Sequence, residues 1–279
     1  MSGLTLIASY PKSGNTWMRA FLASVNRGGE APDINTDLSD VTQLSARGKV
    51  DAAIEEDSSD LTIEEVARIR AHVSRHFAAL GEAALKVHDA NLASPHAEEP
   101  AYPVDVIERV VYIVRDPRDV AVSNTHHFGK TIEDVVTRMA DPDYGIGQAQ
   151  KRLNTQVHQY VSSWSRHVES WLDDTRLNRH LVHYEDMLTD PMTTFTGVVR
   201  FLGLHVDDAV IAKAISATAF DQLAQQEARS GFRERLTQSD APFFRQGRIG
   251  GWRERLSPEL ATRIETDHRA VMQRLGYLD

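Results

Sequence analysis

Residues 4–17 read LTLIASYPKSGNTW, an apolar run followed by a short polar loop and the start of a helical pattern. The apolar run predicts a buried strand, so the loop joins a strand to a helix. The first turn of a helix offers unpaired N–H groups to an anion, and Lys12 places a full positive charge beside them. Ser13 and Gly14 permit close approach of the backbone. The sequence therefore predicts a nucleotide phosphate site in this loop.

The residue order in the loop differs from that of the common nucleoside triphosphatases. A Walker A loop has the form G-x-x-x-x-G-K-[ST], in which the lysine follows the second glycine. Here Lys12 precedes Gly14, which is the only glycine of the loop. This order disfavours ATPases and common kinases, and an ATP-dependent P-loop kinase is kept only as an alternative.

Two later motifs carry further phosphate-binding chemistry. Residues 115–123 read RDPRDVAVS and directly follow the continuous apolar run 110–114. A planar guanidinium such as that of Arg115 can bind phosphate oxygens bidentately, and the hydroxyl of Ser123 adds a neutral donor. Residues 242–253 read PFFRQGRIGGWR and supply more arginine within a glycine-rich loop.

Together these motifs resemble those of sulfotransferases that use 3′-phosphoadenosine 5′-phosphosulfate (PAPS) as donor. YPKSGNTW resembles the loop that binds the 5′-phosphosulfate, and RDPRDVAVS resembles the motif for the 3′-phosphate. The third motif resembles the late R-K-G-x-x-G-x-W loop, with Gln246 in place of the frequent lysine. The motifs occur in the family's order, and the resemblance covers essentially the whole chain.

The resemblance implies a set of residues that bind PAPS. They are Lys12, Ser13, Gly14, Asn15, Thr16, Trp17, Arg115, Ser123, Tyr184, Thr218, Phe220, Arg245, Gln246 and Gly247. Arg115, Ser123 and Arg245 would contact the 3′-phosphate, and the aromatic rings would stack on adenine. Gln246 cannot supply the charge of the missing lysine, and whether Arg248 replaces it stays open.

The resemblance also implies the catalytic residues His88, Lys86, Lys12 and Ser123. Residues 85–88 read LKVH and are similar to the family's K-T-H segment at the end of a strand. There the histidine is the general base for the acceptor, and the lysine helps to hold the sulfuryl group. An imidazole, with an ordinary pKa near 6.5, suits this proton transfer. By the same resemblance, Lys12 stabilises the leaving group and Ser123 steers Lys12.

Composition limits the other function classes. The net charge of -9 disfavours nucleic-acid binding, and a polyanionic donor then requires locally concentrated positive charge. The chain has no cysteine and no apolar run long enough to span a membrane, so a cytoplasmic protein is expected. His72 and His76 have the i, i+4 spacing of half a metal site but lack a third ligand, and no metal is expected.

Alternating strand and helix patterns predict one α/β domain over residues 1–279, with a central parallel sheet flanked by helices. The resemblance implies that this domain has the P-loop-like sulfotransferase fold. Strands are expected at residues 4–8, 83–87, 110–114 and 181–184. Helices are expected at residues 16–25, 62–80, 157–171, 191–203 and 207–216, and from residues 117 and 258 onward. The segment 28–60 is expected to be rich in loops and the segment 129–154 is weakly periodic. As the least regular segments, both are expected to flank the acceptor.

The hypothesis is therefore a PAPS-dependent sulfotransferase, most similar to bacterial ones, whose acceptor is a small molecule, a natural product or a glycan. The alternative from another class is a nucleotide-binding module without turnover, which would be expected to lack His88 or Lys12. His126 and His127 belong either to the acceptor side or to the surface. The acceptor and the oligomeric state are not readable from the sequence.

Overall fold

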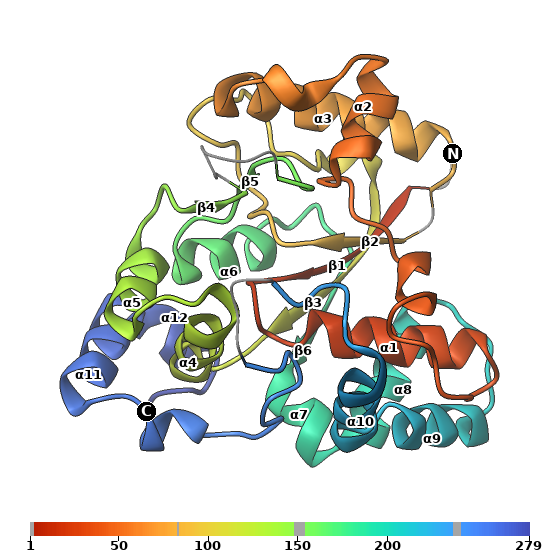
Figure 1. Cartoon of the computed structure of the whole chain (residues 1–279), viewed down its shortest axis with the longest axis vertical. Coiled ribbons are helices and arrows are strands. Elements are labelled where there is room, and N and C mark those ends of the chain that lie inside the picture. Colours follow the sequence, from red (N-terminus) through yellow and green to blue (C-terminus); the bar gives the residue numbers. More distant parts are fainter. Residues whose placement is uncertain (1–2, 83, 148–153, 237–240) are drawn as a thin grey trace. The chain divides into compact units, whose positions relative to one another are not determined.

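A four-stranded sheet with the strand order β2-β1-β3-β6 is central to the fold (Figure 1). Its strands are β1 (Leu4–Ser9), β2 (Ala84–Val87), β3 (Ile107–Val114) and β6 (Arg179–His183). β1 pairs with β2 in parallel, with Thr5 opposite Ala84 and Ala8 opposite Val87. The computed structural model describes residues 3–82, 84–147, 154–236 and 241–279. The predicted α/β fold with a central parallel sheet flanked by helices is confirmed.

The helices alternate with these strands along the chain. They are α1 (Asn15–Asn26), α2 (Arg47–Ile54), α3 (Ile63–Ala79), α4 (Pro117–Phe128), α5 (Ile132–Ala140), α6 (Trp164–Leu172), α7 (Tyr184–Thr189), α8 (Pro191–Phe201), α9 (Asp208–Ala217), α10 (Phe220–Ser230), α11 (Pro258–Asp267) and α12 (Arg269–Arg274). β4 (Gly145–Ile146) and β5 (Gln159–Tyr160) form a separate antiparallel pair.

The contacts within the chain define two compact units. The first unit consists of Met1–Tyr10, Val41–Tyr112 and Arg138–Arg179. The second unit consists of Pro11–Asp40, Ile113–Thr137 and His180–Asp279. All residues predicted to bind the donor belong to the second unit, whereas Lys86 and His88 belong to the first.

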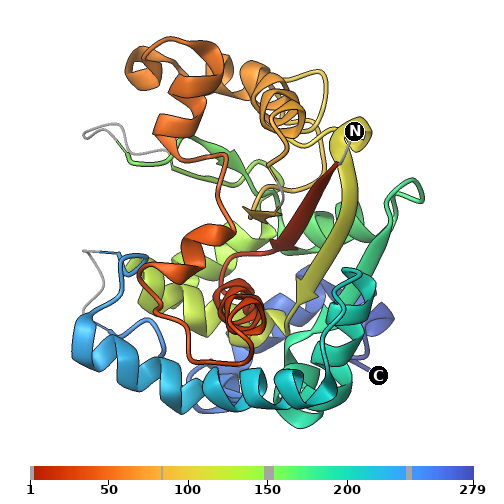
Figure 2. The ribbon, with the colours of Figure 1, turned by 90° about the vertical axis from the view of Figure 1, so that its right-hand side faces the viewer.

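In the second unit, α1 is buried along nearly its whole length. The side chains from Asn15 to Val25 are buried, which explains why this helix needs no strongly amphipathic pattern. The ring of Phe21 stacks on that of Phe195 in α8, with 4.1 Å between the ring centroids. Figure 2 shows α9 running beside α1. The loop that precedes α1 is thus attached to a rigid, packed helix.

In the first unit, a buried ion pair joins α3 to the end of β2. Nη2 of Arg70 lies 2.9 Å from Oδ2 of Asp89, and both side chains are buried. Burial of two charges carries a large desolvation cost, which only good geometry and further hydrogen bonds offset. Here Arg70 also donates to the carbonyl oxygen of His158, and Asp89 accepts from the backbone N–H of Tyr160. The pair therefore connects three segments of the unit.

Local sequence features predicted several boundaries correctly. The Thr62 and Glu65 capping box begins α3, and Gly81, with φ of 78°, follows its end. Asp116 caps α4, which begins at Pro117, and Asp190 caps α8 in the same way. These signals are reliable because each depends on contacts within one helical turn.

One expectation for the helices is wrong. The segment 28–60, expected to be rich in loops, contains α2, and the weakly periodic segment 129–154 contains α5, while residues 148–153 lie outside the described part. The helix expected over residues 157–171 begins only at Trp164, after the N-cap Ser163. Residues before it are extended because Tyr160 bonds through its backbone to Asp89 and Ala90. This pairing over a long sequence distance overrides the local periodicity.

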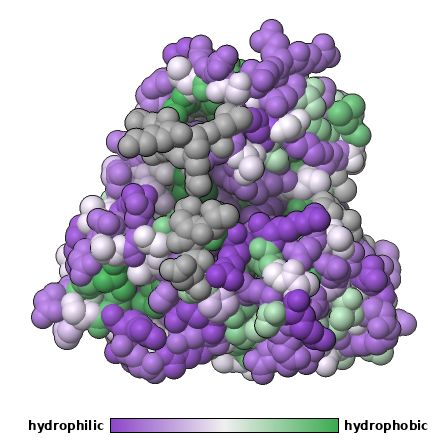
Figure 3. Space-filling model, in the orientation of Figure 1, coloured by the Kyte–Doolittle hydropathy of each residue, from purple (hydrophilic) through white to green (hydrophobic). Residues whose placement is uncertain are grey.

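The visible face of the chain is mostly hydrophilic, with separated hydrophobic patches (Figure 3). Among the described residues, the exposed large hydrophobic side chains are Leu80, Met192 and Ile249, which come from different segments. A search of the described residues finds no helix with the length and apolar composition that crossing a bilayer requires.

Three buried histidines make the fold sensitive to mild acid. Burial lowers the pKa of His167 to about 3, and that of His158 and His268 to about 4. The unfolded chain takes up these protons below about pH 6.5, so the native state loses stability as the pH falls from there toward the folded pKa values. At pH 5 one such histidine costs about 2 kcal/mol.

We expect the free energy of unfolding to fall between pH 7 and pH 5, and His167→Gln to reduce this fall by about 2 kcal/mol. Gln cannot be protonated, so the pH-dependent part of the destabilisation disappears even if the variant is less stable at pH 7. Denaturant titrations at several pH values measure both quantities. An unchanged pH slope in the variant would contradict the assignment.

Candidate active site

The loop between β1 and α1 has a backbone shaped to receive an anion. Lys12 has φ of 70° and Gly14 has φ of 109°, so two residues of the loop adopt left-handed conformations. For Lys12 such a conformation is costly, and strain of this kind is common at ligand sites. Gly14 caps α1 without a side-chain hydrogen bond, and the first turn carries no acidic residue. The N–H groups of this turn therefore point toward the loop, and the turn itself carries no carboxylate that would accept hydrogen bonds from them.

Arg115, which follows β3, joins this loop to the loop of residues 242–253, here called the late loop. Its Nη1 donates to the carbonyl oxygen of Lys12 and its Nη2 to that of Arg248, both at 3.3 Å. Its guanidinium carbon lies 4.1 Å from the centroid of the Tyr184 ring. The Nε of Arg115 is buried and has no hydrogen-bond partner among the described residues. The three motifs of the sequence thus meet at one side chain.

The positive charge near Arg115 is concentrated. Burial lowers the pKa of Arg245, and the neighbouring cations Arg255, Arg115 and Arg248 lower it further. Arg255 and Arg245 also contribute, after burial, to a lowered pKa of His126. Arginine stays charged in proteins, so such a group of cations stabilises a bound anion. The local positive charge that the sequence analysis required of an acidic protein is present.

Carboxylates in the second unit hold the late loop in place. Asp119 on α4 accepts hydrogen bonds from the backbone N–H groups of Gly250, at 2.7 Å, and Trp252, at 2.8 Å. Glu227 on α10 accepts from those of Phe243 and Phe244. Asp119 therefore has a structural role at the start of the short helical turn that follows Gly250.

Two aromatic side chains pack around the start of α1. Tyr184 is buried against Gly14, where an added Cβ would lie 2.7 Å from the tyrosine ring. Trp17 contacts the edge of Tyr184, at 5.9 Å between centroids, and that of Phe195. Asn15 and Thr16 are buried in the same first turn. Glycine at position 14 is therefore required both by its φ and by the close approach of Tyr184.

The other residues predicted to border the base are Thr218, which directly follows α9, and Phe220, which begins α10. Phe220 lies so close to Gly247 that an added Cβ there would lie 2.3 Å from the ring. Thr218 is fully buried, and its hydroxyl donates to the carbonyl oxygen of Ala214 at 2.7 Å. The hydroxyl hydrogen of Thr218 is therefore used within α9, and its oxygen can only accept from a ligand.

Gln246, Arg248 and Ser123 differ in how they are placed. Ser123 and Gln246 are half-buried, on α4 and in the late loop respectively. The side chain of Arg248 makes a two-pronged ion pair with Glu254, which raises its pKa. Because Glu254 neutralises this guanidinium, Arg248 is poorly placed to replace the charge that Gln246 lacks. In the first loop, Nζ of Lys12 lies 3.5 Å from the centroid of the Phe243 ring.

In the first unit, His88 follows β2 and is held by the last residue of β1. Its Nδ1 lies 2.8 Å from the carbonyl oxygen of Ser9. A carbonyl oxygen only accepts, so Nδ1 carries the hydrogen, and in the neutral imidazole Nε2 carries the lone pair. Lys86 is buried two residues earlier on the same face of β2. His88 is therefore a half-buried histidine whose tautomer leaves Nε2 able to accept a proton.

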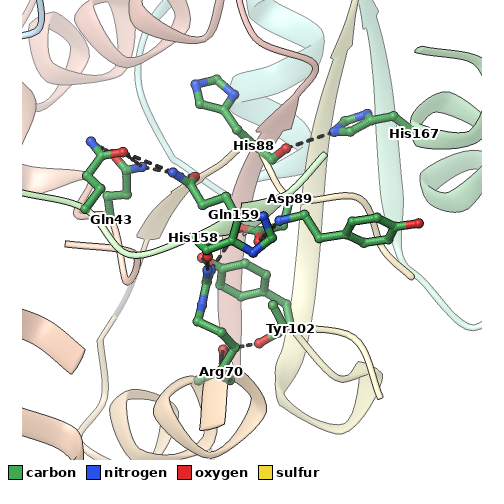
Figure 4. Close-up of polar contacts among 12 residues, drawn as sticks. Gln43, Arg70, His88, Asp89, Tyr102, His158, Gln159 and His167 are labelled. Carbon is green, nitrogen blue, oxygen red and sulfur yellow. Dashed lines mark hydrogen bonds and ion pairs between the residues drawn. The ribbon is translucent and has the colours of Figure 1, made fainter. Parts of the chain in front are cut away.

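A buried polar network lies behind His88 (Figure 4). His167 is neutral at physiological pH, since burial lowers its pKa to about 3. Its Nε2 donates to the carbonyl oxygen of His88 at 3.3 Å, while its Nδ1 accepts from the hydroxyl of Tyr112 at 2.9 Å. Asp89, the next residue after His88, forms the ion pair with Arg70. The roles of His167 and of the Arg70–Asp89 pair were not predictable from the sequence, because no motif joins residues so far apart.

Metal ligands are not grouped in the described part of the chain. No set of three or more His, Cys, Asp or Glu side chains there has a geometry that could hold an ion. His126 and His127 occupy the last turn of α4, where His127 contacts the edge of Phe243 at 5.7 Å between centroids.

Comparison with known proteins identifies the family. A family model described as the sulfotransferase domain matches residues 3–276. Sulfotransferase 1E1 of Bos taurus is 23% identical over 278 residues, which cover 96% of this chain and 83% of the relative. Sulfotransferase 2A6 of Rattus norvegicus is 28% identical over 155 residues, which cover 52% of this chain and 50% of the relative.

Solved structures share the fold. Retinol dehydratase in complex with androsterone and the inactive cofactor PAP has a TM-score of 0.63 at 20% identity, covering 96% of this chain and 80% of that one. Mouse sulfotransferase SULT7A1 complexed with PAP has a TM-score of 0.61 at 22% identity, covering 98% and 85%. Because the family model matches nearly the whole length, this chain belongs to the sulfotransferase family.

Proposed function

We propose that the protein transfers a sulfuryl group from PAPS to a hydroxyl, or an amine, of a small-molecule, natural-product or glycan acceptor, and releases adenosine 3′,5′-bisphosphate (PAP). The observation that carries the proposal is the junction at Arg115. One guanidinium there bonds the phosphate-type loop at Lys12 and the late loop at Arg248, beside the cation Arg245. A ligand with two separated phosphate groups suits such a junction of two anion-binding loops.

The residues of the second unit fit the nucleotide part of this donor. The buried Nε of Arg115 and the fully buried hydroxyl of Ser13 have no hydrogen-bond partners among the described residues. Buried polar groups are normally paired, so both atoms are available to a bound anion. We assign the 3′-phosphate to Arg115, Arg245 and Ser123. We assign the 5′-phosphosulfate to the N–H groups and side chains of residues 12–16.

The aromatic residues support the same orientation. Trp17 and Phe220 offer flat surfaces for the adenine ring, and base–aromatic stacking is sequence-tolerant and favourable. Tyr184 is the first residue of α7 and Thr218 directly follows α9, and we assign both to the border of the base. Similar proteins, retinol dehydratase and SULT7A1, are described in complexes with PAP, which supports PAPS as the donor here.

For catalysis, we assign the general base to His88. The bond to Ser9 fixes its neutral tautomer, so Nε2 would take the proton of the acceptor hydroxyl as the oxygen attacks sulfur. PAPS supplies the activated sulfuryl group, whose bond to the 5′-phosphate oxygen breaks. Lys12, with the amides of the loop, would stabilise the negative charge on that oxygen, and Lys86 would hold the sulfuryl oxygens. Ser123 would steer Lys12.

For the whole protein we propose a single functional domain, a cytoplasmic location and a bacterial origin. The family match includes residues of both units, which supports one functional domain over residues 1–279. A chain without cysteine suits a reducing compartment, and we propose a cytoplasmic location. The similarity of the first loop to bacterial members supports a bacterial origin.

The 3′-phosphate assignment predicts a specific loss of affinity. We expect PAP to bind roughly 100-fold more tightly than adenosine 5′-monophosphate, which lacks the 3′-phosphate, because a paired phosphate gains charge-assisted hydrogen bonds. Arg115→Ala should remove most of this difference while changing the affinity for the monophosphate much less. Isothermal titration calorimetry measures the Kd of each variant for PAP and for adenosine 5′-monophosphate.

The matched control is Arg200→Ala, an exposed arginine in the last turn of α8. It should keep the preference of the unmodified protein for PAP. Equal loss of affinity for both nucleotides in Arg115→Ala, or tighter binding of ATP than of PAP, would contradict the assignment.

The assignment of His88 predicts a loss of turnover without a loss of donor binding. His88→Ala should lower kcat for sulfuryl transfer by about 10²- to 10⁴-fold, the usual contribution of a general base, with the Kd for PAP unchanged. Transfer from radiolabelled PAPS to a panel of phenols, alcohols, amines and sugars measures kcat.

His72→Ala, an exposed histidine on α3 of the same unit, is the control and should keep full activity. A non-catalytic nucleotide-binding module would bind PAP but transfer sulfate to no acceptor in the panel. If His88→Ala retained kcat and its pH profile, the histidine would not be the base.

A further inference from the structure

We infer that Gln43, Gln156 and Gln159, here called the glutamine cluster, select an uncharged acceptor that carries several hydroxyl groups. The inference rests on the proposed function, in which His88 deprotonates the acceptor. All three glutamines and His88 belong to the first unit.

Backbone pairing places Gln43 beside the catalytic end of β2. The preceding residue, Thr42, pairs in parallel with Leu85, and its carbonyl oxygen accepts from the N–H of Lys86 at 2.7 Å. Because the Thr42 carbonyl group is joined to the backbone nitrogen of Gln43, this bond places Gln43 next to the backbone of Lys86. Gln43 thus flanks the strand end from the side opposite to β1.

Gln159 flanks the same strand end from another segment. The next residue, Tyr160, donates its N–H to Asp89 at 3.2 Å, and its carbonyl oxygen accepts from Ala90 at 2.8 Å. These bonds hold β5 against the two residues that follow His88. Figure 4 shows the side chain of Gln159 reaching from this segment to the amide of Gln43. The two amides therefore meet beside the chain that carries the base.

The three amides bond to one another and still retain hydrogen-bonding capacity. Nε2 of Gln43 donates to Oε1 of Gln156 at 3.1 Å and to Oε1 of Gln159 at 3.2 Å. Nε2 of Gln156 donates to Gln43 at 3.2 Å, and Nε2 of Gln159 donates to Gln156 at 3.0 Å. An amide nitrogen has two N–H donors. Within the described residues, one donor of the half-buried Gln156 therefore remains for a ligand, while Gln159, which is 1% exposed, orients Gln156 from behind.

The chemistry of these groups favours hydroxyls over apolar surface and over charge. Gln156 is half-buried, so an apolar acceptor packed against it would leave its remaining amide N–H unpaired. A site built to hydrogen-bond a hydroxyl discriminates strongly against an analogue that lacks it. Neighbouring hydroxyls both donate and accept, as the amides do, and a sugar or cyclic polyol carries several on one face.

Charge near the cluster does not favour an anionic acceptor. Burial lowers the pKa of the neighbouring His158 to about 4, so its imidazole is neutral at physiological pH. The guanidinium of Arg47 donates to the carbonyl oxygens of Asn154 and Ser58 and to the Ser58 hydroxyl. The cation next to Gln43 is Lys86, which the proposed function assigns to the sulfuryl oxygens of the donor. The cluster itself thus offers neutral donors and acceptors.

The test compares two acceptors that share a ring and a primary hydroxyl. Methyl β-D-glucopyranoside carries three further ring hydroxyls, and tetrahydropyran-2-methanol carries none. With PAPS as donor, we expect kcat/KM to be at least about 10-fold higher for the glucoside. Gln159→Leu, and independently the half-buried Gln156→Leu, should each reduce this preference about 10-fold or more through the glucoside alone. The Kd for PAP should not change.

The matched control is Gln225→Leu, an exposed glutamine on α10, which should keep the preference. Thermal unfolding of each variant checks that it is folded, and Gln156→Leu keeps the test valid if Gln159→Leu is not. A preference for tetrahydropyran-2-methanol, or variants that keep the preference for the glucoside, would overturn the inference while leaving sulfuryl transfer intact. Binding of PAP without transfer to any acceptor would instead overturn the proposed function, and this inference with it.

Discussion

The guanidinium of Arg115 is the interaction on which the candidate nucleotide site depends. It bonds the carbonyl oxygens of Lys12 and Arg248 and stacks on Tyr184, so it joins segments more than 100 residues apart in sequence. Planar guanidinium groups make several directed hydrogen bonds at once, which an ammonium group cannot do in a fixed plane. Without this side chain, the first loop and the late loop would lose their shared partner.

Positive charge in this region has a cost that a bound anion would offset. Arg245 lies near Arg115, Arg248 and Arg255, and their mutual repulsion lowers its pKa after the effect of burial. Within the part of the chain that the structure describes, Arg248 is the member of this group that forms an ion pair with a carboxylate, that of Glu254. In a protein with a net charge of -9, such a cluster concentrates the field where a polyanion would bind.

The first unit carries His88, the proposed base, and its neighbours fix the tautomer and position of that histidine. Ser9 fixes the tautomer of His88, and the neutral His167 holds the His88 carbonyl. The ion pair of Arg70 and Asp89 attaches the following residue to α3. Buried ion pairs contribute little net stability, so the role that fits this one is to fix the geometry next to the base. The glutamine cluster adds uncharged donors and acceptors beside it.

Much of the fold and most of the candidate nucleotide site were predictable, because their signals are local. The loop at Lys12, the Asp116-Pro117 helix start and the capping box at Thr62 each depend on residues within a few positions of one another. The residues 157–163 were predicted wrongly as helix, since their extended form depends on Asp89 and Ala90, about 70 residues earlier. The glutamine cluster was missed for the same reason, as Gln43 and Gln156 are 113 positions apart. Such pairings leave no periodic trace in the sequence.

The most direct test of the central claim is a crystal structure of the protein with bound PAP. The account predicts that the 3′-phosphate oxygens lie within hydrogen-bond distance of Arg115 and Arg245, and that the 5′-phosphate lies against the backbone N–H groups at the start of α1. A nucleotide bound in the reverse orientation, or bound away from Arg115, would contradict it.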